Sequence, residues 1–296
     1  MPSSPPGLTG TMRFDILSEP GRGVVTRSSL IKLDDVFAAR IRPGSGEGVL
    51  WIHPYTLDSS SWAELWEQLP GWNHIGIDLP GHGLSMPLGP KEDLPLLARR
   101  IGKLAIEKGA RHLVALSFGS LVALQVAIEY PRAFDSMVLA SPALGGGPHE
   151  EAIGVRFREL VSMFRMGGFG PHLRGRWMLT VPSLFEGLEA RAELWDRLWR
   201  IVGRHGFWEL GERTPLRFVT HSQTRNQLRG IEVPTLVLVG GKDLHAFKRS
   251  AEWIRRTIPR CQRVELEGAG HLCLLEAPDR AARILEDHLR ARGACA

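Results

Sequence analysis

Residues 23–42 alternate between hydrophobic and polar side chains, as short strands do. Residues 29–33 and 36–41 show this alternation on either side of Asp34 and Asp35, which predicts an antiparallel hairpin within residues 23–42. Four further segments are short and apolar, as expected for strands with both faces covered. These segments are residues 48–52, 74–78, 113–116 and 136–140.

Between and after these strands, apolar residues recur at helical spacing. The predicted helices cover residues 62–69, 94–108, 121–130 and 278–292. Two more strands are expected late in the chain, at residues 234–239 and 262–266. Strands that alternate with helices predict an α/β fold, in which a mostly parallel central sheet has helices on both faces.

Residues 145–229 interrupt this alternation, because they contain helical patterns and loops but no convincing buried strand. We interpret them as a helical cap insertion, with residues 23–144 and 230–296 forming the core and residues 1–22 a flexible lead segment. The aromatic side chains of the insertion are expected to divide between a small core of its own and the wall of an apolar pocket. They include Phe157, Phe164, Phe169, Trp177, Phe185, Trp195, Trp199 and Trp208.

Composition argues against several classes of protein. The chain has 296 residues, of which 43% are hydrophobic and 23% charged, as is usual for a globular domain. Its 37 basic and 32 acidic residues give a net charge of +5, and the basic ones are scattered, which argues against nucleic-acid binding. No apolar run reaches the roughly 18 residues of a membrane span. The first residues lack the features of a signal peptide, so we expect a cytoplasmic protein.

The chain contains three cysteines, Cys261, Cys273 and Cys295. Their positions match neither metal-ligand spacing nor a disulfide framework. We therefore expect reduced thiols, and we predict neither a metal ion nor another cofactor.

One serine, Ser117, stands between a predicted strand and a predicted helix. The residues two before and two after it, Ala115 and Gly119, are both small. A strand that turns sharply into a helix through a serine is typical of the nucleophile elbow, whose strained turn tolerates only small neighbours. Ala115 replaces the first glycine of that pattern but adds only one methyl group. Ser117 is therefore a candidate nucleophile.

A serine nucleophile needs a histidine to accept its proton and a carboxylate to orient that histidine. On this kind of sheet the partners are expected in the order serine, acid, histidine, each in a loop after a strand. Asp243 follows the strand at 234–239, and His271 follows the strand at 262–266. We predict a triad of Ser117, Asp243 and His271. The loop after Ser141 contains no nearby carboxylate, and we expect His245 at the surface or at the rim of the pocket.

Acyl transfer places negative charge on the substrate oxygen, so two backbone N–H groups are expected to converge on it. The N–H of Phe118, the residue after the nucleophile, is the first candidate. The second is expected from the loop after the strand at 48–52. Tyr55 is the predicted donor there, because Pro54 has no N–H. His53 is expected to support this loop, and the Tyr55 phenol either packs or contacts the substrate.

The segment Asp-Leu-Pro-Gly-His-Gly-Leu-Ser at residues 78–85 resembles a loop of the α/β-hydrolase superfamily, in particular of its cap-bearing members. The segments around Asp243 and His271, the latter followed by Glu276, are also similar to that family. The similarity extends over residues 49–142 and 234–289. It implies the α/β-hydrolase fold and a covalent serine mechanism. The chain departs from the family at Pro54 and Ala115, where glycine is usual.

These observations predict a serine hydrolase that cleaves a carboxylic ester, thioester or lactone of an apolar small molecule through an acyl-enzyme. The same site would also suit an acyltransferase or cyclase, or a hydrolase of carbon–carbon bonds. A ligand-binding protein that keeps the fold without catalysis is a further alternative. The pattern of residues alone does not distinguish the substrates, because this fold supports many reactions.

Overall fold

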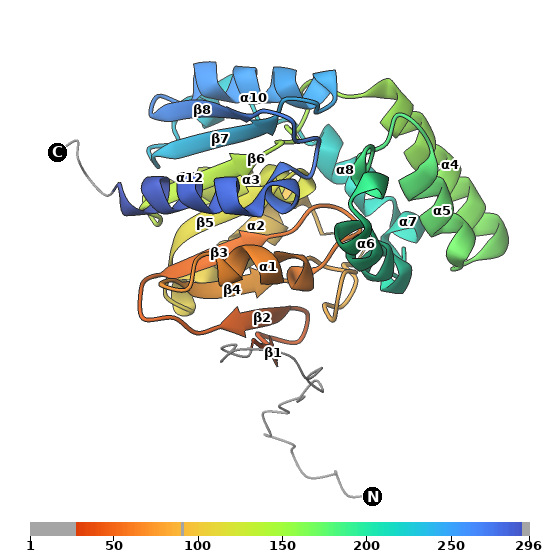
Figure 1. Ribbon diagram of the computed structural model, residues 1–296, viewed down its shortest axis with the longest axis horizontal. Helices are drawn as coiled ribbons and strands as arrows, with labels where there is room; N and C mark the ends of the chain where they lie inside the picture. The colour runs from red at the N-terminus through yellow and green to blue at the C-terminus, as the bar shows by residue number, and fades with distance from the viewer. Residues whose placement is uncertain (1–27, 90–91, 292–296) are drawn as a thin grey trace, which may run out of the picture.

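Eight strands form one sheet in the computed structural model, which describes residues 28–89 and 92–291 (Figure 1). Their spatial order is β1-β2-β4-β3-β5-β6-β7-β8. β2 pairs antiparallel with both β1 and β4, and all other pairs are parallel. The strands are β1 (Ser29–Lys32), β2 (Ala38–Arg42), β3 (Gly48–Ile52), β4 (Asn73–Ile77), β5 (Ala110–Leu116), β6 (Ser136–Ala140), β7 (Thr235–Gly240) and β8 (Cys261–Leu266). The predicted hairpin and the mostly parallel sheet are confirmed.

The second strand of the hairpin begins two residues later than the pattern predicts. The side chain of Asp34 accepts hydrogen bonds from the backbone N–H groups of Val36 (2.8 Å) and Phe37 (2.7 Å). These two N–H groups are therefore used within the turn, and pairing in the sheet starts only at Ala38.

Helices cover both faces of the sheet, as predicted. In Figure 1, α1 (Ala63–Glu67) and α12 (Pro278–Arg290) lie in front of the sheet, and α2 (Leu94–Glu107) and α3 (Phe118–Glu129) lie behind it. α10 (His245–Thr257) packs against β7 and β8. Two short helices, the 3-10 helix η1 (Ser59–Trp62) and α11 (Cys273–Glu276), both contact α1. Residues 118–127 of α3 are all buried, which explains why that helix is apolar on every side.

Only helices and loops occur between β6 and β7 among the described residues. Most of these helices gather beyond one end of the sheet (Figure 1). The helices are α4 (Glu151–Gly167), α5 (Pro171–Leu179), η2 (Leu188–Ala190), α6 (Ala192–Arg204), α7 (Glu209–Glu212), α8 (Thr214–Thr220) and α9 (Arg225–Arg229). α9 differs from the others, because it packs against α3 and α10. On α6, the rings of Trp195 and Trp199 stack with centroids 5.7 Å apart, and both are partly buried against the hydrophobic core.

Both cysteines in the described part of the chain are free thiols. Burial raises the pKa of Cys261 and of Cys273 to about 12, so both stay protonated at neutral pH. Cys295 and the predicted flexible segment 1–22 lie outside the described residues. None of the described helices is both long enough and apolar enough to span a membrane.

Candidate active site

Ser117 occupies a sharp turn between β5 and α3. Its backbone has φ 56° and ψ −118°, in the region that favours glycine, so the turn is strained. A Cβ atom on Gly119 would lie 2.2 Å from the carbonyl oxygen of Ile52, so this position requires glycine. Ala115 is fully buried, and its carbonyl accepts a hydrogen bond from the Ser120 hydroxyl (3.1 Å). The fold therefore accommodates one methyl group on the other side of the serine.

The structure brings Ser117, His271 and Asp243 together in one hydrogen-bonded chain. His271 Nε2 lies 2.7 Å from Ser117 Oγ, and His271 Nδ1 lies 2.8 Å from Asp243 Oδ1. The three side chains come from the loops after β5, β8 and β7, and each residue is only 5–6% exposed. In this arrangement the imidazole can accept the hydroxyl proton while the carboxylate holds its other nitrogen as N–H. His245 is exposed at the start of α10, outside this chain.

The two loops that carry Asp243 and His271 are in close contact. A Cβ atom on Gly240 would lie 2.0 Å from the carbonyl oxygen of Gly270, so only glycine permits this approach. Asp243 Oδ1 also accepts the backbone N–H of Leu244 (2.7 Å), which orients the carboxylate. The position of the acid relative to the histidine is therefore set by the backbone as well as by the side chains.

The carboxylate of Glu276 holds the loop that carries His271 in position. It accepts the backbone N–H of Gly270 (2.8 Å) and that of Leu272 (3.0 Å), the residues on either side of His271. Burial raises the pKa of Glu276, whereas the Gly270 N–H acts in the opposite direction. The sequence analysis noted Glu276 only through the family resemblance and did not identify this role.

The loop after β3 is held in a defined shape beside Ser117. His53 Nδ1 donates to the carbonyl of Pro54 (2.8 Å), and its Nε2 accepts the N–H of Leu79 (2.8 Å), so His53 supports the loop as expected. The Pro54 carbonyl also accepts the N–H of Leu57 (3.2 Å). Within the described chain, the backbone N–H groups of Tyr55 and Phe118 have no acceptor.

The Tyr55 side chain makes a contact that sequence reasoning did not find. Its hydroxyl donates to Glu209 Oε1 of α7 at 2.6 Å. Burial and the neighbouring Glu209 carboxylate raise the pKa of Tyr55 well above its ordinary value, so the phenol remains a donor. Its ring lies among those of Phe118, Phe157 and Trp177, with centroids 5.2–6.1 Å away. Phe157 and Trp177, from the segment between β6 and β7, therefore pack against this loop.

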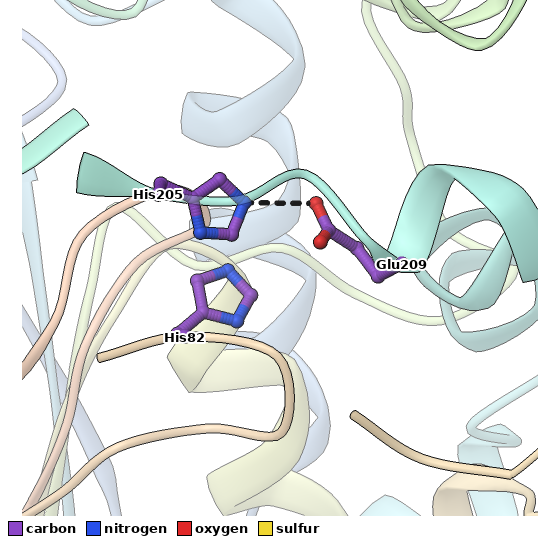
Figure 2. Close-up of side chains that lie close together, drawn as sticks. All are labelled: His82, His205 and Glu209. Atoms are coloured by element: carbon purple, nitrogen blue, oxygen red, sulfur yellow. Dashed lines mark hydrogen bonds and ion pairs between the residues drawn. The ribbon is translucent and has the colours of Figure 1, made fainter. Parts of the chain in front are cut away.

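Among the described residues, two groups of titratable side chains could hold a cation, and one of them lies beside Tyr55: His82, His205 and Glu209 (Figure 2). The other group, which is less buried, is Glu47, His112 and Asp135. His205 Nε2 lies 2.9 Å from Glu209 Oε1, and the His205 ring stacks on His82 at 4.3 Å. His82 Nδ1 donates to Pro80 (3.0 Å), and its Nε2 accepts the Thr56 N–H (3.2 Å). Burial lowers the pKa of His82 well below its ordinary value. A cation would have to displace a hydrogen bond, because both His82 nitrogens are engaged.

Curated relatives of this chain include hydrolases of acyl compounds. The monoacylglycerol lipase of Homo sapiens is 24% identical over 273 residues, which cover 86% of this chain and 78% of the relative. The pimeloyl-[acyl-carrier protein] methyl ester esterase of Aeromonas salmonicida is 26% identical over 256 residues, covering 82% and 96%.

Solved structures share the fold over most of its length. A thermophilic esterase from Thermogutta terrifontis superposes with a TM-score of 0.73 at 23% identity, covering 95% of this chain and 98% of that one. The enol-lactonase from Burkholderia xenovorans gives a TM-score of 0.71 at 22% identity, covering 86% and 96%. The sequence profile of the alpha/beta hydrolase family matches residues 49–284, most of the chain. With the sheet order and the loop positions described above, this match shows that the chain belongs to the alpha/beta hydrolase family.

Proposed function

We propose that this protein is a serine hydrolase that cleaves a carboxylic ester, thioester or lactone of a small, mainly apolar molecule through a covalent acyl-enzyme. The observation that carries the proposal is the continuous hydrogen-bonded chain from Ser117 through His271 to Asp243. Such a chain converts a weakly nucleophilic hydroxyl into one that can attack a carbonyl carbon.

In the proposed reaction, Ser117 Oγ attacks the substrate carbonyl while His271 Nε2 takes its proton. Asp243 keeps the imidazole in the tautomer with a proton on Nδ1 and stabilises the imidazolium that forms. The imidazolium then protonates the leaving alcohol or thiol, which leaves Ser117 acylated. Water, deprotonated by His271, releases the acyl group as an acid and restores the serine.

The proposed oxyanion site consists of the backbone N–H groups of Phe118 and Tyr55. Phe118 is the first residue of α3, where N–H groups have no partner within the helix. The Tyr55 loop is held by His53 and by the Pro54 carbonyl, so its N–H is fixed before the reaction starts. Donors that are already in position stabilise the developing charge without reorganisation.

We further propose that the helices between β6 and β7 form a cap over this site. Trp177 of α5 donates from its indole N–H to Thr56 Oγ1 (2.9 Å), and Glu209 of α7 binds Tyr55. The nearly complete burial of Ser117 supports a site that excludes water during the reaction. The aromatic rings of Phe118, Phe157 and Trp177 favour an apolar substrate.

The experiment that tests the proposal compares wild type with Ser117→Ala on a panel of esters, acyl thioesters and lactones of increasing chain length. Wild type is expected to hydrolyse part of the panel, and a fluorophosphonate is expected to label Ser117. Ser117→Ala is expected to lower kcat by about 10⁴-fold or more, as removal of a serine nucleophile does.

Ser250→Ala is the matched control, because Ser250 is a buried serine on α10 outside the hydrogen-bonded chain. It is expected to keep both turnover and labelling. Turnover that survives in Ser117→Ala, or a wild-type protein without an adduct on Ser117, would refute the proposed mechanism.

A further inference from the structure

Glu209 lies at the start of α7, beside the Tyr55 loop, and is 6% exposed. The carboxylate accepts two hydrogen bonds, from Tyr55 (2.6 Å) and from His205 (2.9 Å), and both end on the same oxygen, Oε1. Two donors on one oxygen fix the orientation of the carboxylate. The direction of the other oxygen is therefore set by the protein.

That other oxygen, Oε2, is buried and has no hydrogen-bond partner among the described residues. A buried polar atom without a partner is unfavourable, and this is more so for a carboxylate oxygen than for a neutral group. The Tyr55 and His205 bonds to Oε1 do not relieve this cost. A donor from outside the described chain, on a ligand or a water molecule, would relieve this cost.

The surroundings of Oε2 belong to the loops around Phe118, the residue that follows Ser117. A Cβ atom on Gly81 would be 3.6 Å from Oε2, which places the oxygen beside the loop after β4. Glu209 also lines a crevice together with Phe118 and His82. The free volume of this crevice is about that of one water molecule. Glu209 thus contacts the phenol of Tyr55 and shares a crevice with Phe118, the two residues whose backbone N–H groups are the proposed oxyanion donors.

We propose that Glu209 is a specificity-determining residue, whose oxygen Oε2 accepts a hydrogen bond from a hydroxyl or N–H group of the substrate. This inference rests on the proposed function. It narrows the substrate class to an ester, thioester or lactone that is mainly apolar but carries one donor near the reacting carbonyl. A purely aliphatic substrate leaves Oε2 without a partner, and a substrate with a carboxylate at this point is repelled.

An ordered water molecule or a bound cation would also satisfy Oε2, and Figure 2 shows His82 and His205 close to Glu209. A water molecule would give no preference between substrates, and the hydrogen bonds of His82 argue against the cation. Its Nε2 already accepts the Thr56 N–H, so a metal ion at this nitrogen would leave that N–H without an acceptor. A hydroxyl or N–H group can reach Oε2 without displacing any of these bonds.

The test uses esters in matched pairs that differ only in a hydroxyl and its O-methyl ether. One series carries this group on the acyl chain at increasing distance from the carbonyl, and hydroxyethyl and methoxyethyl hexanoate carry it on the alcohol. Wild type is expected to prefer the hydroxyl member of at least one pair by about 10- to 100-fold in kcat/KM, the range for a hydrogen bond to a charged group.

Glu209→Gln is the decisive variant, because it has the same shape. Its amide oxygen is expected to take the place of Oε1, where it accepts from Tyr55 and His205, and its NH₂ group then replaces Oε2. An NH₂ group can donate to a hydroxyl and to an ether alike, so the preference is expected to fall to about twofold or less. Glu189→Gln, an exposed cap position, is the control and is expected to keep the preference.

A wild-type preference that persists in Glu209→Gln would mean that the ether is excluded by its size, which would overturn the proposal. The absence of any hydroxyl preference in wild type would overturn it as well. So would a preference that disappears after treatment with a chelator, because this would indicate a metal ion. Labelling of Ser117 by a fluorophosphonate tests the proposed hydrolase function separately, so failure of that function is distinguishable from failure of this inference.

Discussion

The indole N–H of Trp51 on β3 donates a buried hydrogen bond to Nδ1 of His74 on the neighbouring strand β4, with 3.0 Å between the two nitrogens. His74 Nε2 in turn donates to the carbonyl of Leu69 (2.8 Å). Nδ1 therefore serves as an acceptor, which only the neutral imidazole can do. Burial accordingly lowers the pKa of His74 to about 4.

We predict that the folded protein loses stability as the pH falls, because it requires His74 to stay neutral. Between pH 6.5 and pH 4 the unfolded chain binds a proton at this histidine and the folded chain does not. The free energy of unfolding therefore becomes smaller as the pH is lowered through this window. The full effect for one such group is about 3 kcal/mol, with about 2 kcal/mol lost by pH 5. Urea unfolding at pH 7.5 and pH 5 measures the difference.

His74→Gln tests the assignment, because glutamine has a donor and an acceptor but does not titrate. The variant is expected to lose less stability than wild type between the two pH values, by about 1–2 kcal/mol. His245→Gln, at an exposed position, is expected to behave like wild type. An equal loss of stability in wild type and His74→Gln would show that other groups cause the acid sensitivity.

The carboxylate of Glu276 supports the second prediction. Glu276→Ala leaves the N–H groups of Gly270 and Leu272 without their acceptor, at a cost of about 1–3 kcal/mol for each that stays dry. His271 lies between these two residues, so its ring is expected to lose its fixed position. We expect kcat to fall by about 10- to 100-fold with KM nearly unchanged, because small displacements of a catalytic group have large effects.

Asp279→Ala removes an exposed carboxylate from the start of α12 and is the control for Glu276→Ala. It is expected to keep kcat. Circular dichroism and urea unfolding establish that both variants are folded under the assay conditions. A folded Glu276→Ala protein with wild-type kcat would show that the hydrogen bonds of the loop do not position His271.

The two small residues around Ser117 are expected to respond differently to substitution. Gly119→Ala places a methyl group 2.2 Å from the Ile52 carbonyl, so the elbow has to move. We predict a loss of stability of about 1–3 kcal/mol and at least about tenfold slower labelling by a fluorophosphonate. Ala115→Gly restores the glycine that is usual in the family and costs about 1 kcal/mol of stability, with activity within about twofold of wild type.

Equal effects of the two substitutions would contradict this asymmetry. In that case the strain of the elbow would be shared evenly between both sides of Ser117. The close approach of Gly119 to Ile52 would then not be the feature that requires a glycine.

The fold and the positions of Ser117, Asp243 and His271 could be predicted because the signals are local. A strand appears as a short apolar run, and each of these residues follows such a run directly. On a parallel sheet the ends of these strands meet at one edge, so the order along the chain was sufficient to bring the three residues together.

The contacts of Glu209 could not be predicted in the same way. Glu209 is separated from Tyr55 by 154 residues and lies in a helix of only four residues, which has no readable periodicity. The expectation for Tyr55 concerned its N–H, since that follows from the loop alone. The partner of its phenol depends on how the helices between β6 and β7 pack, and this packing is set by tertiary contacts.

The last prediction concerns access to the serine, which is only 5% exposed. Trp177 of α5 covers the Tyr55 loop and donates to Thr56 Oγ1 at 2.9 Å. Its ring meets that of Tyr55 edge to face, with centroids 5.2 Å apart. We infer that a substrate reaches Ser117 after contacts of this kind separate, so we expect opening of the proposed cap to limit the reaction with large reagents.

Trp177→Phe removes the indole hydrogen bond but keeps an aromatic ring, which weakens the closed arrangement by about 1 kcal/mol. We predict that a bulky fluorophosphonate then labels Ser117 about fivefold faster, whereas global stability falls by no more than that amount. Trp253→Phe, at a half-exposed tryptophan on α10, is the control and is expected to label at the wild-type rate. Slower labelling of Trp177→Phe at unchanged stability would instead assign the indole to binding of the reagent, and would argue against a cap that opens at this contact.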